Sequence, residues 1–257
     1  MKITNINTYH AGDGRRNNIF IEVETDEGIT GTGEAYSIGP DKSVISMLEE
    51  MEPWFIGQEP SRIEWLIRRA KNTMRFPLGH VAWSAISAID IALWDIAGKV
   101  AGVPVYVLLG GKTRDRVRVY HAIYGDSPQR LGENAQQLVA EGYSAFKTSP
   151  LPSNWRELPW REVLLKADER MKTIRELIGD SPDLAVDVHV AIRETSKALE
   201  LAQVITPYKL MFIEEPARAE FIESSAELRR KFRVALATGE NLYGVHRFTE
   251  LLNADAV

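Results

Sequence analysis

Apolar and polar residues alternate along two short segments near the start of the chain. Residues 19–25 read IFIEVET and residues 29–34 read ITGTGE, and the polar tripeptide at 26–28, DEG, lies between them. Alternation on both sides of a glycine-containing turn predicts an antiparallel β-hairpin, because successive side chains of a strand point to opposite faces.

The spacing of apolar residues changes after this hairpin. From about residue 41 to residue 101 they recur at steps of three and four, which predicts amphipathic helices. Gly98 and Gly102 mark the end of the last of these helices. We therefore expect residues 1–113 to form a small α+β domain that ends near the glycine pair at 110–111.

After residue 113 short apolar runs alternate with amphipathic segments. The apolar runs are the candidate strands, and they lie at residues 117–120, 145–147, 184–186, 210–213 and 234–238. A helical segment follows each run, near residues 128–141, 160–178, 194–205, 218–231 and 245–253. Strands that alternate with helices predict an α/β domain whose parallel sheet is joined by right-handed crossovers.

The number of these units bears on the architecture of the second domain. A closed (β/α) barrel of the TIM type has about eight strands. Residues 254–257 resemble only the start of a sixth. We therefore expect residues 114–257 to be such a barrel, truncated after about five βα units, and the chain to be an incomplete gene product. Exposed sheet edges would favour a homo-oligomer.

The composition narrows the possible classes of protein. The net charge is −5 with 26% charged residues. The sequence has no basic stripe of the kind that binds nucleic acid, so we do not expect a nucleic-acid partner. No apolar run is long enough to predict a membrane span or a signal peptide. The absence of cysteine excludes disulfides and thiolate metal sites, and it fits a cytoplasmic location.

Acidic residues follow three successive candidate strands. Asp187, Glu214 and Glu240 are spaced 27 and 26 residues apart, which fits one strand and one helix per interval. Each of them could alone be a helix N-cap or first-turn acid. Because the carboxyl ends of parallel strands meet at one edge of a sheet, we expect the three carboxylates to converge. Three oxygen ligands suit a hard cation, most simply Mg²⁺.

Several motifs resemble those of one enzyme superfamily. They are residues 25–34 (TDEGITGTGE), 88–99 (AIDIALWDIAGK), 108–111 (LLGG), 213–216 (IEEP) and 238–240 (TGE). Together they resemble the mandelate racemase and muconate-lactonizing branch of the enolase superfamily, over essentially all 257 residues. Residues 187–189 (DVH), 207–216 (PYKLMFIEEP) and 239–243 (GENLY) resemble most the galactonate and mannonate dehydratases of that branch.

The resemblance implies Mg²⁺-dependent dehydration of a sugar acid such as galactonate or mannonate. A base removes the proton α to the carboxylate, the metal stabilises the enediolate, and an acid assists loss of the β-hydroxyl. The usual base, a histidine on the seventh barrel strand that an aspartate on the sixth orients, would lie beyond Val257. No residue of the chain matches this dyad, so a catalytically incompetent fragment that binds metal or self-associates stays an alternative.

Two residues near the predicted carboxylates are candidate catalytic groups. His189 lies two positions after Asp187, which would place both on one side of an extended chain, and imidazole is a suitable general acid near neutral pH. Lys147 ends the second candidate strand and is expected to bind the substrate carboxylate or stabilise the enediolate. Relatives that racemise carry a second lysine at the position of Ser149, so the serine argues against the alternative of a racemase or epimerase.

Three further residues are candidates for substrate binding. Arg15 and Arg16 lie in a polar loop that, in the family, folds over the mouth of the barrel, and either is able to pair with a carboxylate. His121 follows the first candidate strand of the second domain. For each of the three, an ordinary solvated side chain is an equally good interpretation.

Overall fold

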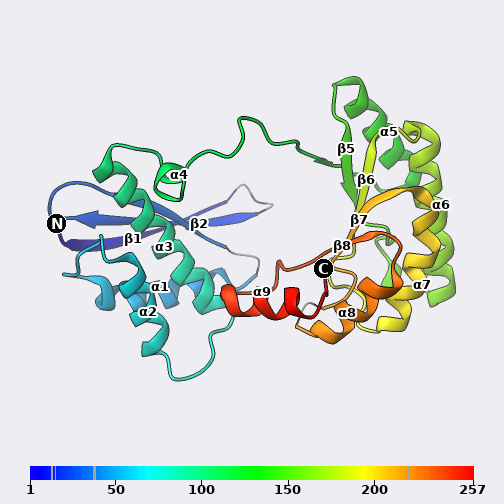
Figure 1. The fold of residues 1–257 in the computed structure, drawn as a ribbon. Coiled ribbons are helices and arrows are strands. Elements are labelled where there is room, and N and C mark those ends of the chain that lie inside the picture. Colours follow the sequence, from blue (N-terminus) through cyan, green and yellow to red (C-terminus); the bar gives the residue numbers. More distant parts are fainter. Residues whose placement is uncertain (13, 15, 37–38, 219) are drawn as a thin grey trace. The chain divides into compact units, whose positions relative to one another are not determined.

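The two strands of the predicted hairpin pair with each other, and the first of them also pairs with a strand that precedes it. A computed structural model describes residues 1–257 except 13, 15, 37–38 and 219 (Figure 1). Strands β1 (Ile3–Gly12), β2 (Asn17–Thr25) and β3 (Gly31–Ala35) form an antiparallel sheet in that order. The pairing of β2 with β3 confirms the predicted hairpin.

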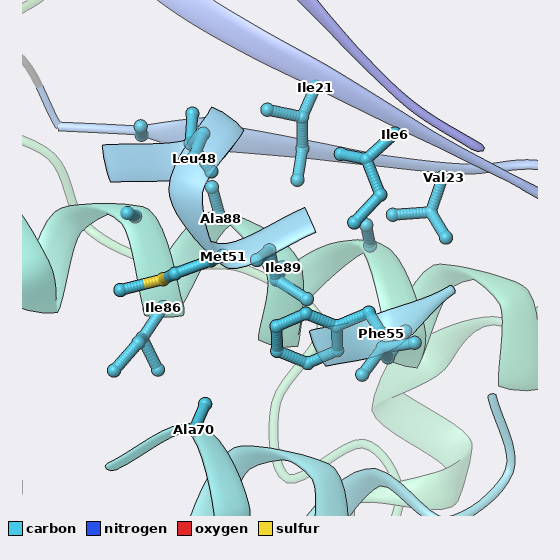
Figure 2. Packing of buried hydrophobic residues seen from close by; sticks show 14 of the residues in the cluster. Ile6, Ile21, Val23, Leu48, Met51, Phe55, Ala70, Ile86, Ala88 and Ile89 are labelled. Atoms are coloured by element: carbon cyan, nitrogen blue, oxygen red, sulfur yellow. The ribbon is translucent and has the colours of Figure 1, made fainter. Parts of the chain in front are cut away.

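Helices cover this sheet and complete the first domain. They are α1 (Asp41–Phe55), α2 (Ile63–Thr73), α3 (His80–Ala101) and the short α4 (Val105–Leu108). Figure 2 shows one apolar core that the sheet, α1 and α3 share, with Ile21, Val23, Met51, Phe55 and Ile89 among its members. The change of apolar spacing after the hairpin therefore marks the change from sheet to helices.

Helix α3 lies directly against strand β3. A Cβ atom at Gly33 would lie 2.0 Å from the carbonyl oxygen of Ala88, so only glycine allows this approach. By length and composition α3 would also be able to cross a membrane, but 56% of its apolar window is buried inside the protein. We interpret α3 as a core helix, since its apolar residues pack on the sheet.

The second domain is a parallel sheet of five strands in sequence order. The strands are β4 (His121–Ala122), β5 (Ala145–Thr148), β6 (Asp183–Asp187), β7 (Leu210–Glu214) and β8 (Ala235–Ala237). The helices that follow them are α5 (Pro128–Ala140), α6 (Trp160–Ile178), α7 (Thr195–Ile205), α8 (Ile222–Lys231) and α9 (Gly244–Asn253). Short 3-10 helices, η1 (Trp155–Glu157) and η2 (Thr206–Tyr208), precede α6 and β7. In Figure 1 helices α5, α6 and α7 lie on one side of this sheet.

The predicted α/β class, with an N-terminal α+β domain and five βα units, is confirmed. Two local predictions are wrong. The first strand is not at 117–120, where Val117 and Val119 are exposed, but at His121–Ala122, which pairs with β5. Residues 254–257 form a turn and irregular chain instead of a strand.

The chain divides into two compact units, Met1–Arg116 and Val117–Val257. The boundary expected from the sequence, after residue 113, lies just before this division. The site described next is built from residues of the second unit.

Candidate functional site

Neighbouring strand ends bring Lys147, Asp187 and Glu214 together. Lys147 lies in β5, and the last residues of β6 and β7, Asp187 and Glu214, are paired in register. The Lys147 Nζ atom lies 2.9 Å from Asp187 Oδ2 and 2.7 Å from Glu214 Oε2. Two carboxylates that folding forces together thus share one positive charge.

The surroundings of Lys147 keep its amine protonated. Burial alone would lower the pKa of this amine, but hydrogen bonds to Glu214 and Asp187 outweigh burial and raise it above its usual value. The amine also lies 5.2 Å from the ring centroid of Tyr120, a favourable distance for a cation over an aromatic face. Lys147 is therefore a cation inside the site and not a surface lysine.

His189 approaches Asp187 through a turn and not through an extended segment. His189 and Val190 have φ angles of 53° and 49°, in the left-handed region that residues other than glycine seldom adopt. The backbone N–H of His189 donates to Asp187 Oδ1 at 2.9 Å, and its Nδ1 lies 3.3 Å from the same oxygen. The side chain of Asp187 is buried and that of His189 is 66% exposed, so the imidazole faces open space beside the carboxylates.

Glu215 fixes the loop after β8. It is almost fully buried, and its Oε1 accepts hydrogen bonds from the backbone N–H groups of Gly239 and Glu240 at 2.7 and 3.2 Å. Burial raises the pKa of Glu215 above its usual value, and these two hydrogen bonds offset only part of that rise. Glu215 thereby anchors the backbone of the residue that carries the third predicted metal ligand.

The three predicted metal ligands are not brought together to the same degree. Among the residues that the structure describes, no three acidic or histidine side chains are grouped closely enough to hold a metal ion. Asp187 and Glu214 meet at Lys147, whereas Glu240 is exposed and stands outside this pair. Coordination by all three stays a prediction.

Of the predicted substrate-binding residues, only His121 belongs to the unit that contains the site. His121 Nδ1 lies 2.7 Å from the carbonyl oxygen of Ala122, and its ring meets that of Tyr143 edge to face. Arg15 lies outside the described residues. Arg16 belongs to the first unit, and its role stays a prediction.

A cleft opens beside the carboxylates at the ends of β5 and β6. It has a volume of about 380 Å³, and Lys147, Asp187 and His189 line it. A second hollow of about 390 Å³ adjoins it and shares His189 and Arg170 with it. Both volumes are in the range of small-molecule sites. The sequence did not single out Arg170, because an arginine within an amphipathic helix is usually solvated.

Comparison with known families matches both units of the chain. Residues 6–110 match the N-terminal domain of mandelate racemase / muconate lactonizing enzymes, and residues 130–257 match the enolase C-terminal domain-like family.

The chain belongs to the mandelate racemase/muconate lactonizing enzyme family. The resemblance seen in its motifs is thereby confirmed. A D-galactonate dehydratase from Xanthomonas euvesicatoria pv. vesicatoria is 35% identical over all 257 residues, which span 66% of that relative's length. The chain thus covers just under two thirds of the curated relatives that it matches.

Solved structures of the family agree with the fold. An enolase from Agrobacterium radiobacter, crystallised with sodium and L-malate, aligns with a TM-score of 0.92 at 37% identity, over all of this chain and 66% of that one. The 3,6-anhydro-D-galactonate cycloisomerase from Zobellia galactanivorans aligns with a TM-score of 0.86 at 28% identity, over all of this chain and 70% of that one. Both family members act on, or were crystallised with, small organic acids.

Proposed function

We propose that this protein takes part in the metal-dependent dehydration of a sugar acid. The observation that carries the proposal is the pair of carboxylates, Asp187 and Glu214, which face one cation next to an exposed histidine and a cleft. The 35% sequence identity with a D-galactonate dehydratase supports dehydration as the class of reaction.

The residues of the site fit a hard divalent cation. Asp187 and Glu214 are oxygen donors on strand ends, and their contact with the Lys147 ammonium supports a site that favours positive charge. Asp187, Glu214 and Glu240 would hold Mg²⁺. Bound there, Mg²⁺ would draw negative charge from the substrate carboxylate and make the adjacent α-proton more acidic.

The other residues act on the substrate directly. The Lys147 ammonium, held at the ends of β5 to β7, would stabilise the negative charge that develops on the substrate carboxylate as the α-proton leaves. His189 directs Nδ1 to Asp187, which leaves Nε2 to give a proton to the departing β-hydroxyl. A general base, a role that none of these residues fills, would accept the α-proton. The C–O bond would then break, the β-hydroxyl would take a proton from His189 and leave as water, and the resulting enol would tautomerise to a 2-keto-3-deoxy acid.

The test is to incubate the protein with a panel of aldonates and aldarates in D₂O, with Mg²⁺ or with EDTA. We expect Mg²⁺-dependent formation of a 2-keto acid, seen both by colour reaction of the carbonyl and by NMR. Exchange or inversion at the α-carbon without keto acid would support an epimerase instead. Metal binding without either reaction would contradict the proposed activity for this chain.

A further inference from the structure

Arg170 lies at the edge of the buried face of helix α6. The neighbouring residues Ala167, Met171 and Ile174 of this helix are fully buried. The Arg170 Nε–H donates to the carbonyl oxygen of Ser149, 2.9 Å away, just beyond the end of β5. The guanidinium is therefore fixed through Nε to the residue that directly follows β5, the strand that carries Lys147.

The other edge of this guanidinium has no counter-charge. Among the described residues, Arg170 forms no ion pair, and its side chain has one hydrogen bond, the one from Nε to Ser149. Burial lowers the pKa of Arg170, and no nearby carboxylate offsets that effect. An arginine stays charged even so, and a half-buried cation without a partner is costly unless an anion binds to it.

Arg170 lines both hollows of the site, the cleft that also holds Lys147 and the hollow that adjoins it. The adjoining hollow also contains Arg156, whose guanidinium lies 4.7 Å from the ring centroid of Trp155. Asp126, at the edge of that hollow, forms no ion pair with either arginine within the described part of the chain. The region farther from Lys147 thus carries an excess of positive charge.

We propose that Arg170 binds a second carboxylate of the substrate, at the end remote from the carbon that loses its proton. This inference rests on the proposed function. The substrate is then an aldarate, a sugar acid with a carboxylate at both ends, and not an aldonate. The remote end of an aldonate is a hydroxymethyl group, which would leave Arg170 without a counter-ion. A guanidinium fixed through Nε still offers both Nη groups, which suits bidentate binding of a carboxylate.

The experiment compares two ligands that differ at one carbon. Galactarate and D-galactonate share their other stereocentres and differ at C6, which is a carboxylate in the first and a hydroxymethyl group in the second. Their affinities are measured by titration calorimetry with Mg²⁺ for the wild type and for Arg170→Gln. We expect the wild type to prefer galactarate by roughly 10- to 100-fold, the range for a charge-assisted hydrogen bond. Arg170→Gln should lose this preference while its affinity for galactonate changes by less than about twofold.

Two further variants separate binding from folding. Arg161→Gln removes the same charge from the same helix at an exposed position outside both hollows, and it should keep the preference. Arg170→Lys keeps a charge but has no fork to serve both Ser149 and a ligand, so the preference should fall at least about fivefold. If Arg170→Gln is too unstable to measure, Arg170→Lys decides the question.

The outcomes distinguish this inference from the proposed function. Equal affinity of the wild type for both sugar acids, or equal weakening of both by Arg170→Gln, would overturn the inference and leave sugar-acid chemistry standing. Adipate, which has the six-carbon chain and the two terminal carboxylates of galactarate but no hydroxyl group, is the third ligand. Binding of adipate that depends on Arg170, without reaction of any sugar acid, would uphold dicarboxylate recognition and overturn the dehydratase. Binding of none of the three would overturn both.

Discussion

Replacement of Lys147 by methionine tests whether its amine occupies the place of a metal ion. Methionine is of similar length and apolar, so the change mainly removes the charge that Asp187 and Glu214 share. The two carboxylates, fixed on paired strand ends, then face each other without a cation. The metal-free variant should therefore be less stable than the wild type.

The size of the loss follows from burial. Loss of one partner of a fully buried ion pair costs about 3–5 kcal/mol. Here the side chains of Lys147 and Glu214 are 17% and 19% exposed and the group opens onto a cleft, so solvent weakens the effect. We take about 2–3 kcal/mol, which corresponds to a fall in melting temperature of about 5–10 °C for a protein of this size.

Magnesium should reverse this loss. A ligand at about 100 times its Kd stabilises the folded state by about 2.7 kcal/mol. The variant has no ammonium that competes for Asp187 and Glu214, so Mg²⁺ should bind it more tightly than it binds the wild type. Its melting temperature should return to about the wild-type value at saturation.

The assay is thermal unfolding of both proteins across a Mg²⁺ titration. Lys172→Met is the control, since Lys172 is an exposed lysine on α6 with a long contact to Glu176. Two results would refute the reasoning. One is an unchanged melting temperature of metal-free Lys147→Met, and the other is a smaller stabilisation of the variant than of the wild type by Mg²⁺.

The remaining predictions concern the acid, a buried arginine and a glycine. His189→Asn should lower kcat by about 10²–10⁴-fold, with almost unchanged melting because the side chain is exposed; a large loss of stability would contradict a catalytic role. Arg175→Met removes a buried guanidinium that donates to four backbone carbonyls. Urea unfolding should show that the free energy of unfolding falls by about 3–5 kcal/mol. A fall below about 1 kcal/mol would contradict a stabilising role for these four hydrogen bonds. Gly33→Ala forces a Cβ atom into the Ala88 carbonyl and should cost about 3 kcal/mol, measured by hydrogen exchange in β3; unchanged protection would show that α3 can move.

The strand ends of the second domain were predictable because each has a local signal. An apolar run followed by an acidic residue, repeated at similar intervals, located Asp187 and Glu214 at the carboxyl ends of β6 and β7. The position of β4 was not predictable in this way. Val117 and Val119 have the alternation of a strand, but pairing with β5 decides the strand, and it takes place at His121–Ala122.

The contacts between distant residues could not be predicted from periodicity. The placement of Lys147 between two carboxylates depends on the register of three strands. The bond from Arg170 to Ser149 joins residues 21 positions apart, and its only local sign is the place of Arg170 next to Met171 on the buried face of a helix. The left-handed turn at His189 replaces the extended backbone assumed from the sequence, because the Asp187 carboxylate accepts its N–H.

The most direct test of the account is the location of the metal by anomalous diffraction from crystals grown with Mn²⁺, which binds oxygen ligands like those of Mg²⁺. We predict one ion at about 2.1 Å from carboxylate oxygens of Asp187, Glu214 and Glu240, with the Lys147 amine moved out of the position between Asp187 and Glu214. An ion bound elsewhere, or a Lys147 amine that still bridges these two carboxylates at saturating Mn²⁺, would contradict the account.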